Sequence, residues 1–198
     1  MALSDLEAIL VEGCRRGDEE AWRTLFRTYA PDLGRYLRGM VRDRAEVDDL
    51  VQASLIEFLR SIDRFRGEAS LRTWLHRIAR HVALTASRGR TRREKHLAAY
   101  AARERRRAPD PHAAVEARQR LGWVHRLIDE LEPDFREVWL LREVQHLEVA
   151  ECATVLDIPP GTVLTRHHRA RQKLIAMLES LEEEPPAPLR LVNDGEES

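Results

Sequence analysis

Apolar residues recur in the first half of the chain at the three- and four-residue spacing of a helix. The four stripes with this spacing begin at Trp22, Leu33, Val51 and Leu71. Phe26 belongs to the first of them and Leu59 to the third. Each stripe has charged residues on its opposite side, which is the pattern of an amphipathic α-helix that buries one face in a shared core. Asp18 and Ser70 are expected to be N-caps of the first and last of these helices. We therefore predict a helical domain over residues 1–88.

The chain changes character after this domain. Residues 89–115 are basic, poor in apolar side chains and closed by Pro109 and Pro111, which predicts a flexible basic linker. Residues 116–180 regain helical periodicity and are predicted to form a second, smaller domain. Residues 181–198 are acidic and Pro-rich, which predicts a disordered tail. The expected fold class is all-α, with two small helical domains joined by the linker.

The second domain contains two apolar stripes separated by a sharp turn. The first stripe runs from Val149 to Leu156. The segment 157–161, DIPPG, ends it, because a proline removes a backbone donor and disfavours helix at the residue before it. A longer, basic helix is expected to begin at Thr162. Two such helices form a helix-turn-helix, whose second helix enters the major groove of DNA.

The polar face of this second helix carries side chains suited to DNA. It holds Thr162, Thr165, Arg169 and Lys173, with Arg166 and His168 on its flanks. Arg169 is placed to reach the edge of a guanine base. Phosphate contacts, which position a protein without reading sequence, are expected from Arg166, Arg171 and Lys173. His167 is on the apolar face and is expected to pack in the core. The alternative is a helical hairpin with a basic face that never meets DNA.

Charge is distributed unevenly along a chain whose formal net charge is -1. Residues 60–107 hold 15 Lys and Arg against 4 Asp and Glu, whereas residues 179–198 hold 7 acidic residues against one Arg. Such asymmetry indicates a polyanionic partner. An Arg-rich surface that has no partner is the alternative.

The composition also argues against several classes of protein. No stretch approaches 18 apolar residues, so no membrane insertion is expected. Asp5 and Glu7 stand where a signal peptide would be basic, so the chain is expected to be cytoplasmic. Cys14 and Cys152 are isolated and far apart, so neither a disulfide framework nor a cysteine metal site is expected.

Four segments, in family order, resemble the extracytoplasmic-function group (group IV) of bacterial RNA polymerase sigma factors. Residues 157–174, DIPPGTVLTRHHRARQKL, are similar to the terminal helix-turn-helix of that family, and residues 65–83, FRGEASLRTWLHRIARHVA, to its −10 reading segment. Residues 43–59, DRAEVDDLVQASLIEFL, are similar to its core-binding helix, and residues 17–37, GDEEAWRTLFRTYAPDLGRYL, to its opening helices. Four ordered matches are a more specific signal than one motif.

The resemblance implies an initiation subunit that binds core RNA polymerase, directs it to promoters and assists promoter melting. Such a protein is not an enzyme and needs no cofactor or metal, because the polymerase supplies the chemistry. Its implied partners are core polymerase, promoter DNA (double-stranded at −35, single-stranded at −10) and an anti-sigma factor. The implied −35 contacts are Thr162, Leu164, Thr165, Arg166, His168, Arg169, Arg171 and Lys173. The implied −10 contacts are Asp63, Phe65, Arg66, Gly67, Ser70, Arg72, His76, Arg77, Arg80 and His81. The implied core-polymerase contacts are Asp48, Asp49 and Gln52.

The residues of the −10 segment are consistent with these roles. The apolar stripe from Leu71 leaves a basic face that is expected to be exposed, made of Arg72, His76, Arg77 and Arg80. A basic face beside the loop 63–70 suits capture of a single strand with one flipped base. Trp74 shares the apolar stripe and is expected in the core rather than stacked on a base.

The chain departs from the family pattern at several positions. Asp157 stands where the family usually has Gly at a helix end, and Glu148 replaces the usual Ser or Thr cap. Leu164 replaces a usual Lys or Arg, which leaves an apolar contact such as one to a thymine methyl.

Two other classes of protein end in a helix-turn-helix. A serine recombinase would need a mixed α/β catalytic domain, and the first half of this chain shows no strand periodicity. A stand-alone transcription regulator would use its first domain to bind a ligand or to dimerise. Co-elution with core polymerase separates that regulator from a sigma factor.

Overall fold

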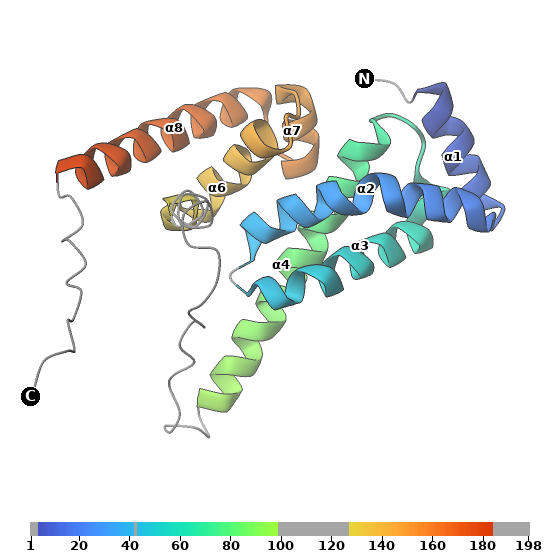
Figure 1. Ribbon diagram of the computed structural model, residues 1–198, viewed down its shortest axis with the longest axis horizontal. Coiled ribbons are helices and arrows are strands. Elements are labelled where there is room, and N and C mark those ends of the chain that lie inside the picture. Colours follow the sequence, from blue (N-terminus) through green and yellow to red (C-terminus); the bar gives the residue numbers. More distant parts are fainter. Residues whose placement is uncertain (1–3, 42, 99–126, 184–198) are drawn as a thin grey trace, which may run out of the picture.

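The computed structural model describes residues 4–41, 43–98 and 127–183, and the regular elements in these ranges are helices (Figure 1). The first domain consists of α1 (Asp5–Arg15), α2 (Glu19–Met40), η1 (Arg44–Glu46), α3 (Val47–Ser61), η2 (Ile62–Arg64) and α4 (Leu71–Ala98). The second domain consists of α6 (Pro133–Trp139), the π-helical η3 (Leu140–Val144), α7 (Val149–Leu156) and α8 (Pro160–Glu183). The all-α fold class is thus confirmed. No described helix is long and apolar enough to cross a bilayer.

Side-chain caps fix where the helices of the first domain begin. The Asp18 carboxylate accepts from the Glu20 N–H at 3.0 Å, and Ser70 Oγ accepts from the Thr73 N–H at 3.1 Å, so both predicted N-caps are confirmed. The Trp22 and Leu33 stripes lie on one helix, α2, which contains Pro31. Helix α1 has a capping box at Ser4 and was not predicted.

The core of the first domain is formed by the predicted apolar stripes. Phe58 is fully buried, and its ring meets Trp22 and Trp74 edge to face at centroid distances of 5.9 and 5.3 Å. Phe26 and Leu59, assigned to the same stripes, are 49% and 42% exposed, so their predicted place in the core was wrong. These two stripes are wider than the surface that the neighbouring helices cover.

The residues of the turn determine where the helices of the second domain end and begin. Asp157 closes α7 with φ 57° and ψ 48°, the left-handed conformation that Gly usually supplies at this place. The next helix begins at Pro160 rather than at Thr162, because the fixed φ of proline suits the first helical position. Glu148 begins α7 with its N–H donating to the Glu151 carboxylate at 3.0 Å.

The predicted linker is only partly described. Residues 89–98 continue α4, so the helix extends into the first part of the predicted linker. Arg, Lys, Glu and Ala are good helix formers, and they extend the helix without apolar periodicity. The rest of the linker and most of the acidic tail lie outside the described residues.

The two domains pack directly against each other. Helix α7 lies on α4, and η3 and α6 contact α2. In Figure 1 the second domain lies alongside α2 and the upper part of α4. One cluster of buried apolar residues runs through both domains. Cys14 and Cys152 are both buried in it as free thiols.

Candidate nucleic-acid interface

The amino-terminal part of α8 presents an exposed face. Leu164, Thr165, His168, Arg169 and Arg171 are exposed on this helix. A hollow of about 430 Å³ adjoins the face and is lined by Asp134, Phe135, Gly161, Thr162, Thr165, Arg166 and Arg169. Leu164 is a large apolar side chain that is nevertheless 56% exposed. The predicted −35 contacts therefore lie close together on an accessible surface, and Lys173 lies farther along the same helix.

Acidic residues hold two of the predicted phosphate contacts. Arg166 forms an ion pair with Asp134. Lys173 forms an ion pair with Glu132 and lies 5.1 Å from the centre of the Phe135 ring. Exposed ion pairs contribute little net stability, so a phosphate can replace either carboxylate at small cost. Sequence reasoning did not identify the two acidic partners, because they precede the helix-turn-helix and have no spacing rule.

His167 is not the fully packed core residue that its place on the apolar face predicted. Its side chain is 24% exposed, and Nε2 lies 2.7 Å from the Glu143 carboxylate. The imidazole also stacks on Trp139 at a centroid distance of 5.9 Å. A polar ring at the edge of an apolar face keeps its hydrogen bond by facing a carboxylate at the rim.

The loop between α3 and α4 borders an open pocket, to which Thr154 of α7 also contributes. The pocket has a volume of about 730 Å³ and is lined by Asp63, Arg64, Phe65, Arg66, Glu68, Ala69, Trp74, Arg77 and Thr154. Gly67 turns the loop with φ 74°, a conformation that favours glycine. Asp63, Arg66, Arg77 and His81 are exposed. Phe65 is only 5% exposed because its ring packs on Trp74 at 4.7 Å. Trp74 is half-buried and lines the pocket, so it is less enclosed than predicted.

His76 is buried, which contradicts its predicted place on the exposed basic face. Its exposed fraction is 0%. Nδ1 lies 2.8 Å from the Arg72 carbonyl oxygen, and Nε2 lies 3.2 Å from the Gln145 Oε1. Burial lowers the pKa of His76 below its ordinary value, so the ring is neutral at neutral pH. The prediction failed because the second domain covers this part of α4.

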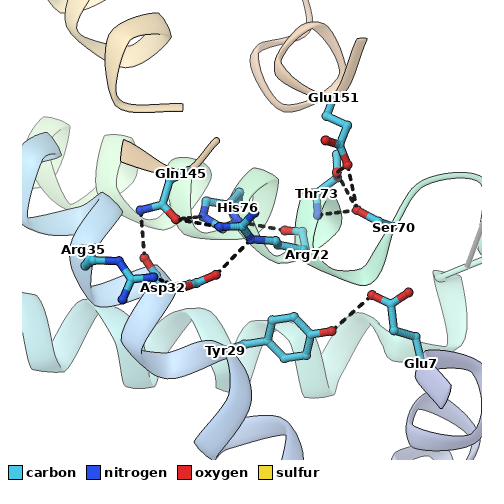
Figure 2. A network of polar contacts seen from close by, with 10 residues as sticks. All are labelled: Glu7, Tyr29, Asp32, Arg35, Ser70, Arg72, Thr73, His76, Gln145 and Glu151. Atoms are coloured by element: carbon cyan, nitrogen blue, oxygen red, sulfur yellow. Dashed lines mark hydrogen bonds and ion pairs between the residues drawn. The ribbon is translucent and has the colours of Figure 1, made fainter. Parts of the chain in front are cut away.

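A polar seam joins α4 to the second domain (Figure 2). Arg72 Nε donates to the Asp32 carboxylate at 2.9 Å, and its Nη2 donates to Gln145 Oε1 at 3.3 Å. The Gln145 amide nitrogen donates to the Asp32 carbonyl oxygen at 3.2 Å. The hydroxyls of Ser70 and Thr73 donate to the Glu151 carboxylate at 3.2 and 3.0 Å.

An ion pair extends the seam along α4. Arg80 Nε donates to the Glu137 carboxylate at 2.9 Å, and the Glu137 side chain is only 8% exposed. Burial raises the pKa of Glu137 more than the Arg80 guanidinium lowers it, so the net shift is upward. Sequence reasoning missed Glu137, Gln145 and Glu151. A polar residue within an otherwise apolar stretch was the sequence signal that could have identified them as buried partners.

The predicted core-polymerase contacts lie together on α3. Asp48 and Asp49 occupy its first turn, where acidic side chains suit the helix dipole, and both are exposed. Gln52 follows on the same helix and borders an apolar groove of about 510 Å³ between α2 and α3. The exposed apolar residues of the groove are Phe26, Ile56 and Leu59. Among the described residues, no group of three His, Cys, Asp or Glu could hold a metal ion.

Two family models match separate parts of the chain. Residues 25–93 match Sigma-70 region 2, and residues 121–174 match Sigma-70, region 4. The chain is 30% identical over 189 residues to the RNA polymerase sigma-H factor of Pseudomonas aeruginosa, covering 91% of this chain and 98% of that protein. It is 32% identical to the ECF RNA polymerase sigma-E factor of Haemophilus influenzae (88% of this chain, 96% of that protein). It is 33% identical to the ECF RNA polymerase sigma factor SigX of Bacillus subtilis (84% and 88%).

Solved structures show the same fold. CnrH in complex with the cytosolic domain of CnrY is 26% identical, with a TM-score of 0.67 over 87% of this chain and 96% of that chain. The sigma factor RpoE of Bartonella quintana, in complex with the anti-sigma factor NepR, is 21% identical, with a TM-score of 0.65 over 79% and 96%.

Proposed function

The chain belongs to the extracytoplasmic-function group of RNA polymerase sigma factors, and on that premise we propose which of its surfaces perform each step of promoter recognition. As an alternative sigma factor it directs RNA polymerase to promoters. Sigma factors are initiation subunits, and we infer that this one makes and breaks no covalent bond, because the polymerase supplies the metal and the phosphoryl transfer.

The exposed face of α8 reads the −35 element as a duplex. Arg169 reaches a guanine edge, and the exposed Leu164 contacts a thymine methyl. Arg166, Arg171 and Lys173 contact phosphates, which fix the register of the helix in the groove. This assignment is supported by the common exposure of these side chains at the start of α8.

The pocket of the α3–α4 loop receives a base of the single-stranded −10 element. Its volume of about 730 Å³ is ample for one base. Arg66 and Arg77 at its rim meet the phosphates, and the half-buried Trp74 supplies an aromatic surface. Phe65 and Ser70 hold the loop in shape from within, since both are buried.

The start of α3 and the groove beside it dock on core polymerase. Asp48, Asp49 and Gln52 are exposed on one helix. Exposed apolar residues border Gln52, and contiguous exposed apolar surface marks interaction sites in soluble proteins.

An anti-sigma factor is a further proposed partner. The similar structures CnrH and RpoE are each bound to a second protein, named as the anti-sigma factor NepR in the case of RpoE. We also infer that the chain acts in the cytoplasm, where its polymerase and promoters are. Of the acidic tail that was predicted to be disordered, residues 181–183 continue α8 and the rest lies outside the described residues.

The observation that carries the proposal is that the three proposed surfaces, at the start of α8, at the loop pocket and at the start of α3, are separate and accessible. The test is run-off transcription by core polymerase on genomic promoter fragments, with and without the protein. New discrete transcripts are expected. Failure to co-elute with core polymerase would reject the docking role of Asp48, Asp49 and Gln52 and favour a stand-alone regulator.

A further inference from the structure

The α3–α4 loop, which borders the pocket proposed for the −10 base, is held at its two ends rather than along its middle. At its carboxyl end, Ser70 Oγ accepts from the Thr73 N–H at 3.1 Å and begins α4. At its amino end, the Phe65 N–H donates to the Ile62 carbonyl oxygen at 3.1 Å. Within the part of the chain that the structure describes, no hydrogen bond holds the backbone of residues 66–69. The place of this middle part therefore depends on how firmly the two ends are fixed.

A side chain from α1 fixes the amino end of the loop. Arg15 Nη2 donates to the carbonyl oxygens of Ile62 and Phe65, at 3.3 and 2.5 Å. Ile62 is the C-cap of α3 and Phe65 is the C-cap of η2, so both oxygens belong to helix ends, where basic side chains commonly supply hydrogen bonds. A guanidinium suits this place because it is always charged and donates in fixed directions. Figure 1 shows the loop running beside α1.

Helix α1 carries Arg15 at a fixed place because it packs closely on α2. A Cβ atom added at Gly13 would lie 2.7 Å from the Cβ of Ala21, closer than two such carbons approach. Cys14 is only 3% exposed, and the Asp18 N–H donates to the Gly13 carbonyl oxygen at 3.0 Å. The backbone of Arg15 is thus anchored on α2, while its side chain reaches the loop.

The contact of Arg15 with the loop determines where one wall of the pocket lies. The carbonyl oxygen of Phe65 is held by Arg15, and its ring is held by Trp74 at a centroid distance of 4.7 Å. The chain then continues through Arg66, which lines the pocket, to Gly67. The backbone direction at Phe65 decides where these following residues go. Arg15 therefore acts on the pocket although it is not one of the residues that line it.

Resting on the proposed function, we propose that Arg15 is a positioning residue for recognition of the −10 base, because it holds the α3–α4 loop in the shape that admits one unpaired base. A pocket that is formed in advance binds a base without first paying for the ordering of the loop. Arg15 lies outside residues 25–93, the part of the chain that matches Sigma-70 region 2. Its ion pair with Glu12 is 3.7 Å long and exposed to water, so the two carbonyl contacts are the ones that matter for the loop.

Arg15 and Arg16 are a matched pair for the test. Arg16 is the C-cap of α1 and is exposed, and among the described residues its side chain has no hydrogen-bond or ion-pair partner. Arg15→Ala and Arg16→Ala thus remove the same charge from neighbouring positions, and only the first removes the contacts with the loop. Each full-length variant is assembled with core polymerase and mixed with a pool of single-stranded DNA that has a random central segment. Sequencing of the bound strands gives the base preference at each position.

The expected result is a loss of base preference confined to one position. In Arg15→Ala the preference at that position should fall about tenfold or more, the order expected for loss of a hydrogen bond to a charged group, while the other positions keep theirs. Arg16→Ala should match the unmodified chain. Arg15→Lys should recover part of the preference, because a single nitrogen donates both bonds and an ammonium group has three donors.

Hydrogen exchange of the free full-length chain gives a second measurement, which needs no DNA. The amides of residues 63–70 should exchange faster in Arg15→Ala than in Arg16→Ala, while those of α1 and α2 keep their protection. Faster exchange throughout α1 and α2 would show that Arg15 stabilises the whole domain, and this would overturn the positioning role.

The outcomes separate this inference from the proposed function. If the unmodified holoenzyme shows no base preference on single strands, the −10 assignment of the pocket fails, and the role of Arg15 fails with it. If the unmodified chain shows a preference that Arg15→Ala retains, the positioning role alone fails. A loss of binding that is equal for all sequences would make Arg15 a phosphate contact, which also overturns the positioning role.

Discussion

Replacing Asp157 by Gly should stabilise the second domain, because this residue closes α7 in the left-handed conformation. Its φ of 57° and ψ of 48° bring the Cβ of an L residue close to a backbone carbonyl oxygen. The N–H of Asp157 and that of Ile158 both donate to the Ala153 carbonyl oxygen, the latter at 3.2 Å, so the conformation is fixed by the helix end.

The magnitude follows from two opposing terms. Relief of the Cβ contact favours Gly over Ala by roughly 1–2 kcal/mol, and the greater freedom of Gly in the unfolded chain returns about 0.4–1 kcal/mol. The stability of the chain with Asp at this position lies between those with Gly and with Ala, because the short polar side chain of Asp tolerates the left-handed region. We expect Asp157→Gly to raise the free energy of unfolding by about 0.5 kcal/mol and Asp157→Ala to lower it by a similar amount.

Urea unfolding followed by circular dichroism measures both variants. The control position is Thr154, an exposed residue within α7, where the order of the two variants reverses. There the free energy of unfolding of Thr154→Ala should exceed that of Thr154→Gly by about 1 kcal/mol. An Asp157→Ala variant as stable as Asp157→Gly would refute the left-handed assignment and the physical reason for the departure from the family pattern.

Three further outcomes are expected. Arg169→Ala should weaken −35 binding by about 1–3 kcal/mol and relax it at one base, measured by competition; an equal loss on all sequences would make it a phosphate contact. Asp134→Asn should free Arg166 and steepen the salt dependence of duplex binding, and an unchanged salt slope would contradict this. Acidification below about pH 6.5 should open the chain, because neutral His76 is enclosed and the open state binds more protons there. His76→Gln should lose that part of the pH response in X-ray scattering.

The sequence predicted what depends on short-range chemistry. The helical stripes, the caps at Asp18 and Ser70 and the turn at residues 157–161 each follow from local spacing or backbone preference, and each is present. The side chains assigned to the −35 element are together for the same reason, since one helix presents them.

The burial of individual side chains was not predicted where it depends on which other segment covers a helix face. The basic face of α4 and its partners Glu137, Gln145 and Glu151 are polar, so a search for apolar periodicity does not detect their contact. His76 looks exposed on a helical wheel and is buried by a segment about seventy residues away. Phe26 and Leu59 belong to apolar stripes but lie outside the area that their neighbours cover. Spacing defines a face and does not identify its partner.

Burial makes the two thiols of the chain poor targets for oxidants. Burial raises the pKa of Cys14 to about 11, with a smaller contribution from the Asp18 charge, and burial raises that of Cys152 to about 12. Because peroxides and disulfides react with the thiolate, both sulfurs are unreactive at neutral pH. Cys14 and Cys152 are the two cysteines of the printed sequence, so neither offers the reactive thiolate that a thiol-based redox switch needs.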